Sequence, residues 1–180
     1  MACITKLAHA IAYNCDSGTT GISSAVIINK ADIVSFTLAG ATGVVSALTL
    51  ASGAKAYKID TIKRSLVVST ALKVNDGAPN AFTHTATLTD MTHATSRTHF
   101  NISSAMSNGS FVIISRPAGG TYAVVSGLYY GMSAKAFDQN SHENGAWATI
   151  TLETPENVIG EDNLSMADTD YDALYEGAVG

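Results

Sequence analysis

The sequence predicts a mainly β protein: a single-domain β-sandwich or barrel with one flanking α-helix and a long β-hairpin. Short segments in which apolar and small polar residues alternate recur along most of the chain, separated by turn residues. Only one stretch, within residues 94–108, places apolar residues at helical spacing. At 180 residues, one domain spanning residues 1–180 is expected, with an acidic C-terminal extension from about residue 156.

The strands expected before the helix are short, and turns separate them. Residues 33–38 alternate apolar and polar side chains, which predicts a half-buried strand. Asn75-Asp76-Gly77 predicts a turn between two later strands. Threonine, which favours strands, is abundant in the last of them. The expected strands in this part of the chain are residues 22–29, 33–38, 44–50, 54–60, 65–73 and 81–91.

The helix and the segments after it complete the expected order. Phe100, Ile102 and Met106 form a weak helical stripe, and Asn108-Gly109 is a plausible helix stop. Residues 110–116 predict a buried strand. The long hairpin is expected over residues 121–155: an apolar run through Gly127 and Gly131, a polar loop at 138–145, and an alternating strand at 146–154. A helical turn is expected near residues 170–175.

Charge is sparse and unevenly distributed. Charged residues make up 14% of the chain, below the usual quarter. Residues 136–180 hold ten acidic residues and no Lys or Arg, whereas residues 1–135 hold all ten basic residues and five acids. This asymmetry disfavours nucleic-acid binding by the C-terminal region. It permits head-to-tail contact between copies of the chain, and the alternative is a solvated acidic tail.

The sequence shows no arrangement that carries chemistry. Cys3 and Cys15 have no second pair to complete a four-ligand zinc site. The spacing of His84, His93 and His99 does not make them converge. No G-x-S-x-G elbow marks a nucleophile, and no apolar run of about 18 residues predicts a membrane span. We therefore expect no catalytic residues, no cofactor, no metal and no membrane partner, so the chain is not expected to be an enzyme.

Four large aromatic residues lie on the expected hairpin: Tyr129, Tyr130, Phe137 and Trp147. Aromatic side chains often anchor subunit interfaces, and the alternative for each is core packing. Neighbouring residues on a strand point to opposite faces. At least one of the two tyrosines is therefore expected to face outward, toward solvent or a partner.

Three segments of the chain resemble tail tube or tail ring proteins of tailed bacteriophages, in particular phages of Bacteroidetes-type hosts. The resemblance covers most of the chain and lies in the order of the segments and in the residue pattern within each of them. The first segment is Met1-Ala-Cys3 and Asp16-Ser-Gly18 leading into residues 22–29. The second is Phe82-Thr-His84, the expected helix and residues 111–114. The third is residues 127–132, the 138–145 loop, residues 148–152 and Thr154-Pro155-Glu156.

This resemblance implies a structural virion protein located in the tail and assembled in the host cytoplasm. Its partners would be copies of itself in a ring or tube, neighbouring tail proteins, and genomic DNA that passes through the lumen without specific binding. Acidic side chains lining a lumen would repel phosphates, and the same side chains could instead contact the basic part of the next subunit. The residues expected in either role are Glu161, Asp162, Asp168 and Asp170. The alternative function is a β-sandwich binding or head-decoration module on the virion.

Overall fold

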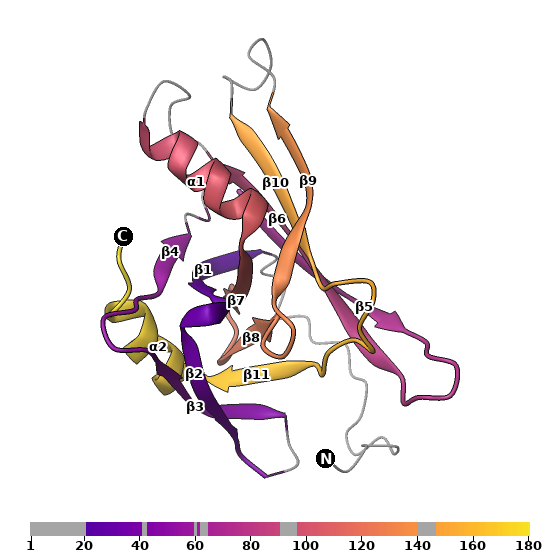
Figure 1. Cartoon of the computed structure of the whole chain (residues 1–180). Helices are drawn as coiled ribbons and strands as arrows, with labels where there is room; N and C mark the ends of the chain where they lie inside the picture. The colour runs from indigo at the N-terminus through magenta and orange to yellow at the C-terminus, as the bar shows by residue number, and fades with distance from the viewer. Residues whose placement is uncertain (1–20, 41–42, 60, 62–64, 91–96, 140–146) are drawn as a thin grey trace.

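The computed structural model describes residues 21–40, 43–59, 61, 65–90, 97–139 and 147–180 (Figure 1). Within these residues, eleven strands form one mixed sheet. The elements are β1 (Ile22–Asn29), a short 3-10 turn η2 (Lys30–Asp32), β2 (Ile33–Leu38), β3 (Val44–Leu50), β4 (Tyr57–Ile59), β5 (Leu66–Lys73), β6 (Ala81–Asp90), α1 (Arg97–Asn108), β7 (Ser110–Pro117), β8 (Tyr122–Ser126), β9 (Met132–Gln139), β10 (Ala148–Glu153), β11 (Leu164–Ala167) and α2 (Asp168–Glu176).

Strand β7 is the branch point of the sheet. On one side it pairs along most of its length with β1, which also pairs with β4. On the other side it pairs with β8 through residues 113–115 and with β9 through residues 110–111. From β8 the sheet continues to β11, β3 and β2, and from β9 it continues to β10, β6 and β5. Figure 1 shows these two arms diverging from the centre of the molecule.

The two central strands are apolar on both faces because each face contributes to a different core. In β1, Val26 and Ile28 belong to the core shared with β8, β11 and α2, while Ile27 belongs to the core shared with β6, β9 and β10. In β7, Ile114 and Ile113 divide in the same way. Successive side chains of a strand point to opposite faces, so an unbroken apolar run is what a strand buried on both faces requires.

Each core has its own helix. Helix α2 covers the first core, in which Tyr171 is fully buried and stacks on Tyr175 with ring centroids 5.8 Å apart. Helix α1 lies beside β9, and its Met106 packs against the second core. The layered packing of sheet and helices around two clusters agrees with the mainly β, sandwich-like class predicted from the sequence.

The sheet is open, which agrees with the sandwich alternative and not with the barrel. Two other details differ from the prediction. Among the described residues, two helices flank the sheet rather than one, because the turn expected near residues 170–175 extends to α2. The long hairpin is also not a single pair of strands. The chain turns at Gly127 (φ 83°) and Gly131 (φ 74°), so the first strand expected in the hairpin is divided into β8 and β9. The hairpin proper consists of β9 and β10.

Candidate assembly surface

Each end of the strand order has an exposed edge. Among the described residues, β5 pairs with β6 and β2 pairs with β3, and each of these end strands has a second edge with no partner strand. Both strands expose large aliphatic side chains: Leu72 is 60% exposed in β5 and Val34 is 67% exposed in β2. An edge strand with apolar side chains is a template for pairing with another chain. Within the described part of the chain, the strand order therefore ends at two separate sites where the sheet can be extended.

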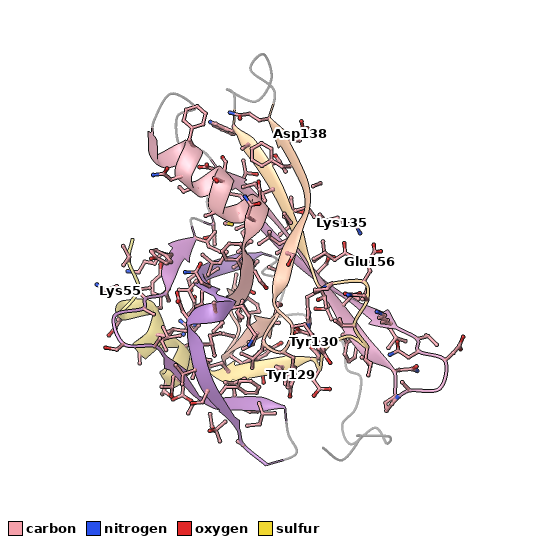
Figure 2. All side chains as sticks on the ribbon, viewed as in Figure 1. Lys55, Tyr129, Tyr130, Lys135, Asp138 and Glu156 are labelled. Atoms are coloured by element: carbon pink, nitrogen blue, oxygen red, sulfur yellow. The ribbon has the colours of Figure 1, made fainter. Side chains whose placement is uncertain are left out.

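The four aromatic residues singled out in the sequence lie in two places. Tyr129 and Tyr130 lie in the turn between β8 and β9, and Phe137 lies near the far end of β9. Trp147 directly precedes β10, which pairs with that end of β9. In Figure 2 the labelled tyrosines are well separated from Asp138, the neighbour of Phe137. The aromatic residues therefore form two pairs rather than one patch, and their role in an interface stays a prediction.

Within the first pair, the two tyrosines have different environments. The ring of Tyr129 meets Phe36 edge-on, with centroids 5.4 Å apart, and its hydroxyl donates to Asp162 Oδ2 at 3.4 Å. Tyr130 is exposed. The expectation that at least one of them faces outward fits Tyr130, although both lie in a turn rather than on a strand.

The four acidic residues expected at a lumen or inter-subunit contact also have different environments. Asp162 and Asp170 are exposed on the subunit. Asp168 is ion-paired within the subunit, through its Oδ1 atom, to Arg116 Nε at 2.9 Å. Glu161 is only 2% exposed, so its carboxylate makes its contacts inside the subunit. Two of the four side chains are thus available at the surface, and two hold the fold together.

Glu161 joins the C-terminal segment to two other parts of the fold. Its backbone exchanges hydrogen bonds with Phe82 at 2.8 and 2.7 Å. Its Oε1 atom accepts a hydrogen bond from the Tyr130 amide at 2.9 Å. Burial raises the pKa of the Glu161 carboxyl, and the backbone amides of Tyr130, Gly127 and Leu128 oppose that rise. Its neighbours in the turn are therefore backbone donors.

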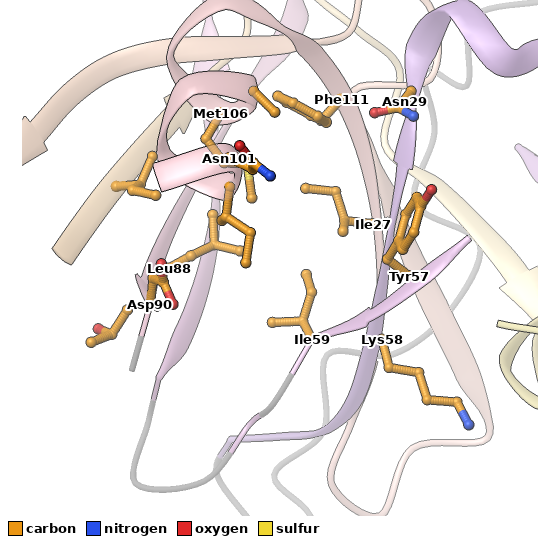
Figure 3. A pocket seen from close by; sticks show the side chains of 14 residues that line it. Ile27, Asn29, Tyr57, Lys58, Ile59, Leu88, Asp90, Asn101, Met106 and Phe111 are labelled. Carbon is orange, nitrogen blue, oxygen red and sulfur yellow. The ribbon is translucent and has the colours of Figure 1, made fainter. Parts of the chain in front are cut away.

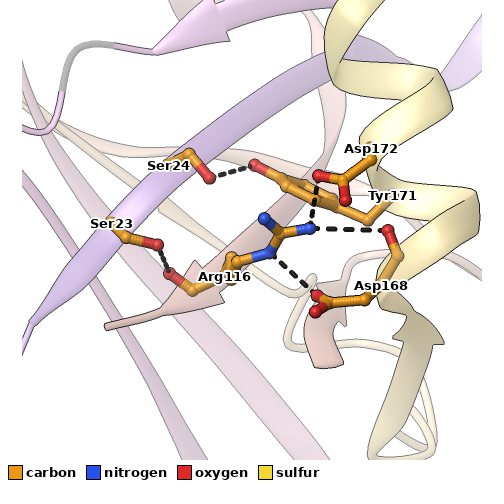
Figure 4. Close-up of polar contacts among 6 residues, drawn as sticks. All are labelled: Ser23, Ser24, Arg116, Asp168, Tyr171 and Asp172. Atoms are coloured by element: carbon orange, nitrogen blue, oxygen red, sulfur yellow. Dashed lines mark hydrogen bonds and ion pairs between the residues drawn. The ribbon is translucent and has the colours of Figure 1, made fainter. Parts of the chain in front are cut away.

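Arg116 holds helix α2 against the sheet (Figure 4). Its guanidinium lies over the Tyr171 ring, 4.5 Å from the centroid, and its Nη2 atom donates to Asp172 Oδ1 at 2.6 Å. The Tyr171 hydroxyl donates to Ser24 Oγ at 2.9 Å. Although burial opposes it, the charges of Asp168 and Asp172 and the hydrogen bond to Asp172 raise the Arg116 pKa. This role of Arg116 is not predictable from the sequence, because nothing in its local pattern marks the residues that it meets.

Of the three histidines considered as metal ligands, the structure describes the side chain of His84. It is fully buried in β6, its Nδ1 lies 3.0 Å from Thr70 Oγ1, and burial lowers its pKa. His93 and the side chain of His99 lie outside the described residues, as do Cys3 and Cys15. Within the described part of the chain, no three His, Cys, Asp or Glu side chains are grouped to hold a metal ion.

Comparison of the chain with protein-family models, curated proteins and solved structures finds no match. No helix among the described residues is long and apolar enough to cross a membrane. The candidate surface is therefore defined by the geometry of the subunit: two exposed sheet edges, two pairs of aromatic residues, and the exposed acids Asp162 and Asp170.

Proposed function

We propose that the chain is a structural virion protein, a subunit of a bacteriophage tail tube or tail ring that self-assembles around a DNA-conducting lumen. The observation that carries this proposal is the open sheet, whose strand order ends in exposed edges at β2 and β5. The segment-by-segment resemblance of the sequence to tail tube proteins supports the same assignment.

Two different edges on one subunit favour head-to-tail assembly. A contact between unlike surfaces closes into a ring when the rotation between subunits allows it, and otherwise propagates as a filament. Strand pairing supplies main-chain hydrogen bonds, and the exposed Val67 and Leu72 on β5 and Val34 on β2 supply apolar contact. The sheet of one subunit would then continue into the sheet of the next.

The charge distribution suits a protein that conducts DNA without holding it. Each Lys or Arg that contacts a phosphate strengthens binding in a salt-dependent way, and residues 136–180 contain none. Asp162 and Asp170 are exposed on the subunit surface. Acidic side chains at the lumen would repel the DNA backbone. At a contact between layers they would instead meet basic residues such as Lys55, which is also exposed.

The test is the assembly state of the full chain, measured by light scattering and negative-stain electron microscopy over a range of concentrations. Rings or tubes are expected. The double substitution Val67→Lys and Leu72→Lys on β5 should abolish the rings or tubes, because charged side chains on an edge strand prevent it from pairing with a strand of another subunit. Replacing Thr169→Lys, at an exposed position on α2, should leave assembly intact. A monomer at every concentration, or assembly unaffected by the β5 double substitution, would contradict the proposal.

A specific observation favours the alternative function, a binding or head-decoration module. The structure contains an apolar groove of about 580 Å³ beside helix α1, a volume within the range of ligand-binding pockets. A binding module would remain small in solution and would require this groove rather than the β2 and β5 edges. The same light-scattering experiment therefore separates the two functions.

A further inference from the structure

An apolar groove lies between helix α1 and the sheet (Figure 3). Helix α1 forms one wall, with Ala105 and Met106, and strands β1 and β4 form the other, with Ile27 and Ile59. In Figure 3 the side chains of Ile27, Ile59 and Met106 point into the space between the two walls, and Lys58 points away from it. The groove thus presents aliphatic side chains from both sides.

The floor of the groove is the second core itself. Leu88 and Phe111 line it, and each is only 5% exposed. The polar side chains Asn29, Asp90 and Asn101 also line the groove. An occupant must therefore be mainly apolar, because a polar group seated on this floor would lose its hydrogen bonds to water.

The first twenty residues of the chain offer a matching surface in their sequence. They lie outside the described residues, and they include Ile4, Leu7, Ala8 and Ile11. This is the i, i+3, i+4, i+7 spacing that gives an amphipathic helix one apolar stripe. Lys6 falls outside the stripe. A helix with such a stripe needs an apolar surface to cover it, since short helices are marginal in water on their own.

The connection to the fold is long enough for this segment to reach the groove. The segment joins β1, whose far end, Asn29, lines the groove. A strand of this length spans about 26 Å. The residues between Ile11 and Ile22 can extend over about 33 Å. The stripe can therefore run back alongside β1 to the groove of its own subunit.

We propose that the groove beside α1 is the docking site of the chain's own N-terminal segment, with Ile4, Leu7 and Ile11 inserted between α1 and the β1–β4 pair. This is the mode in which an amphipathic helix lays its apolar face into a hydrophobic groove. The inference stands independently of the tail function, because it concerns a contact within one subunit.

The test is a disulfide crosslink in the full chain. Cys3→Ser and Cys15→Ser remove both native thiols, and Ala8→Cys is then combined with Ala105→Cys on the helical wall. The matched control combines Ala8→Cys with Ser104→Cys, the preceding residue of α1, which is exposed and does not line the groove. Both substitutions on α1 are at exposed positions, so the fold should be retained, which circular dichroism checks.

Under mild oxidation, the Ala105 pair should form an intrachain disulfide at least about tenfold faster than the Ser104 pair, because the bond requires Cα atoms within about 7 Å. Non-reducing electrophoresis and mass spectrometry measure both rates. Adding Ile11→Asp should remove the difference, whereas Lys6→Asp, outside the stripe, should preserve it. Equal rates for the two pairs, or a disulfide that forms only between chains, overturns the proposal.

Discussion

Two regions of the subunit fix acidic residues of the C-terminal segment in opposite ways. At the β8–β9 turn, the buried Glu161 carboxylate accepts a hydrogen bond from the backbone amide of Tyr130. At helix α2, Asp168 and Asp172 are partly or largely exposed and both meet the guanidinium of Arg116. In the first region, backbone dipoles offset part of the cost of burying a carboxylate, and in the second region an opposite charge near water pairs with the carboxylates.

This difference decides how each region responds to change. Removing a buried acceptor leaves its donor, here the Tyr130 amide, without a hydrogen bond. Removing one member of a partly exposed ion pair lowers the free energy of unfolding by less, because water replaces the missing partner. The turn at Glu161 should therefore be the more sensitive region, although the Arg116 cluster contains three charged side chains, one cation and two carboxylates.

The largest effect is expected from Glu161→Ala. Loss of the carboxylate removes the acceptor of the Tyr130 amide and leaves a small cavity, which together should lower the free energy of unfolding by about 3–4 kcal/mol. Urea denaturation measures this change. The neighbouring substitution Asp162→Ala, at an exposed position, serves as the control and should cost under about 1 kcal/mol. Equal losses would mean that the buried carboxylate has no special role.

A somewhat smaller effect is expected from Gly127→Ala in the same turn. Gly127 has φ 83°, and an added Cβ would lie 2.8 Å from the carbonyl oxygen of Phe111. Gly53 has the same φ but no neighbour within 4 Å. Gly53→Ala should therefore cost only the backbone strain, about 1 kcal/mol, whereas Gly127→Ala should cost about 3 kcal/mol because the neighbours must also move. Thermal unfolding compares the two, and a similar cost would contradict close packing of the turn.

Arg116→Met tests the second region. The substitution keeps aliphatic packing over Tyr171 but removes the ion pairs with Asp168 and Asp172, and it should lower the free energy of unfolding by about 1–2 kcal/mol. The loss should shrink at 1 M salt, where surface charges are screened within about 3 Å. Lys135→Met is the control, since the Lys135 side chain, which pairs with Glu153, is 53% exposed against 21% for Arg116. A loss equal to that of Glu161→Ala would remove the contrast between the regions.

The smallest effect is a dependence on pH. Burial lowers the pKa of His84 from its usual 6.5, so His84 contributes stability above that pH which is lost as the pH falls below it. Burial raises the pKa of Glu161, so its protonation works in the opposite direction and adds stability as the pH falls. His84→Gln should reduce the loss of stability as the pH falls below 6.5, and Glu161→Gln should remove the gain in stability that accompanies protonation as the pH falls toward 4.5. Urea denaturation at several pH values measures how the free energy of unfolding depends on pH. The same dependence in a variant as in the unsubstituted protein would contradict the prediction for that residue.

Much of the strand pattern could be predicted from the sequence because local side chains determine it. The bounds expected for residues 22–29, 33–38 and 44–50 coincide with β1, β2 and β3. The helix expected within residues 94–108 is α1. The apolar run at residues 110–116 indicated the buried strand β7, and the alternation at residues 33–38 indicated the half-buried strand β2.

The remaining features depend on contacts between distant parts of the chain. β11 was missed because its four residues lie in an acidic segment and become a strand through pairing with β8 and β3. The burial of Glu161 was missed because the donors that accommodate it lie more than thirty positions earlier, in the β8–β9 turn. The turn at Gly127 and Gly131 was missed because the apolar run through them was interpreted as one strand, and only the pairing of β8 and β9 with β7 shows that the chain turns there.

The parallel pairing of β3 with β11 also bears on how the subunit is made. It places Val44 opposite Ser165, so β3 stays without this neighbour until about 120 further residues have been synthesised. Sheets built from such distant pairs fold slowly, since the chain must close a long loop before the contact forms. During that delay the edge of β3 is open to other nascent chains. Synthesis of this protein should therefore be helped by slow expression and low temperature, which favour completion of each chain before it meets another.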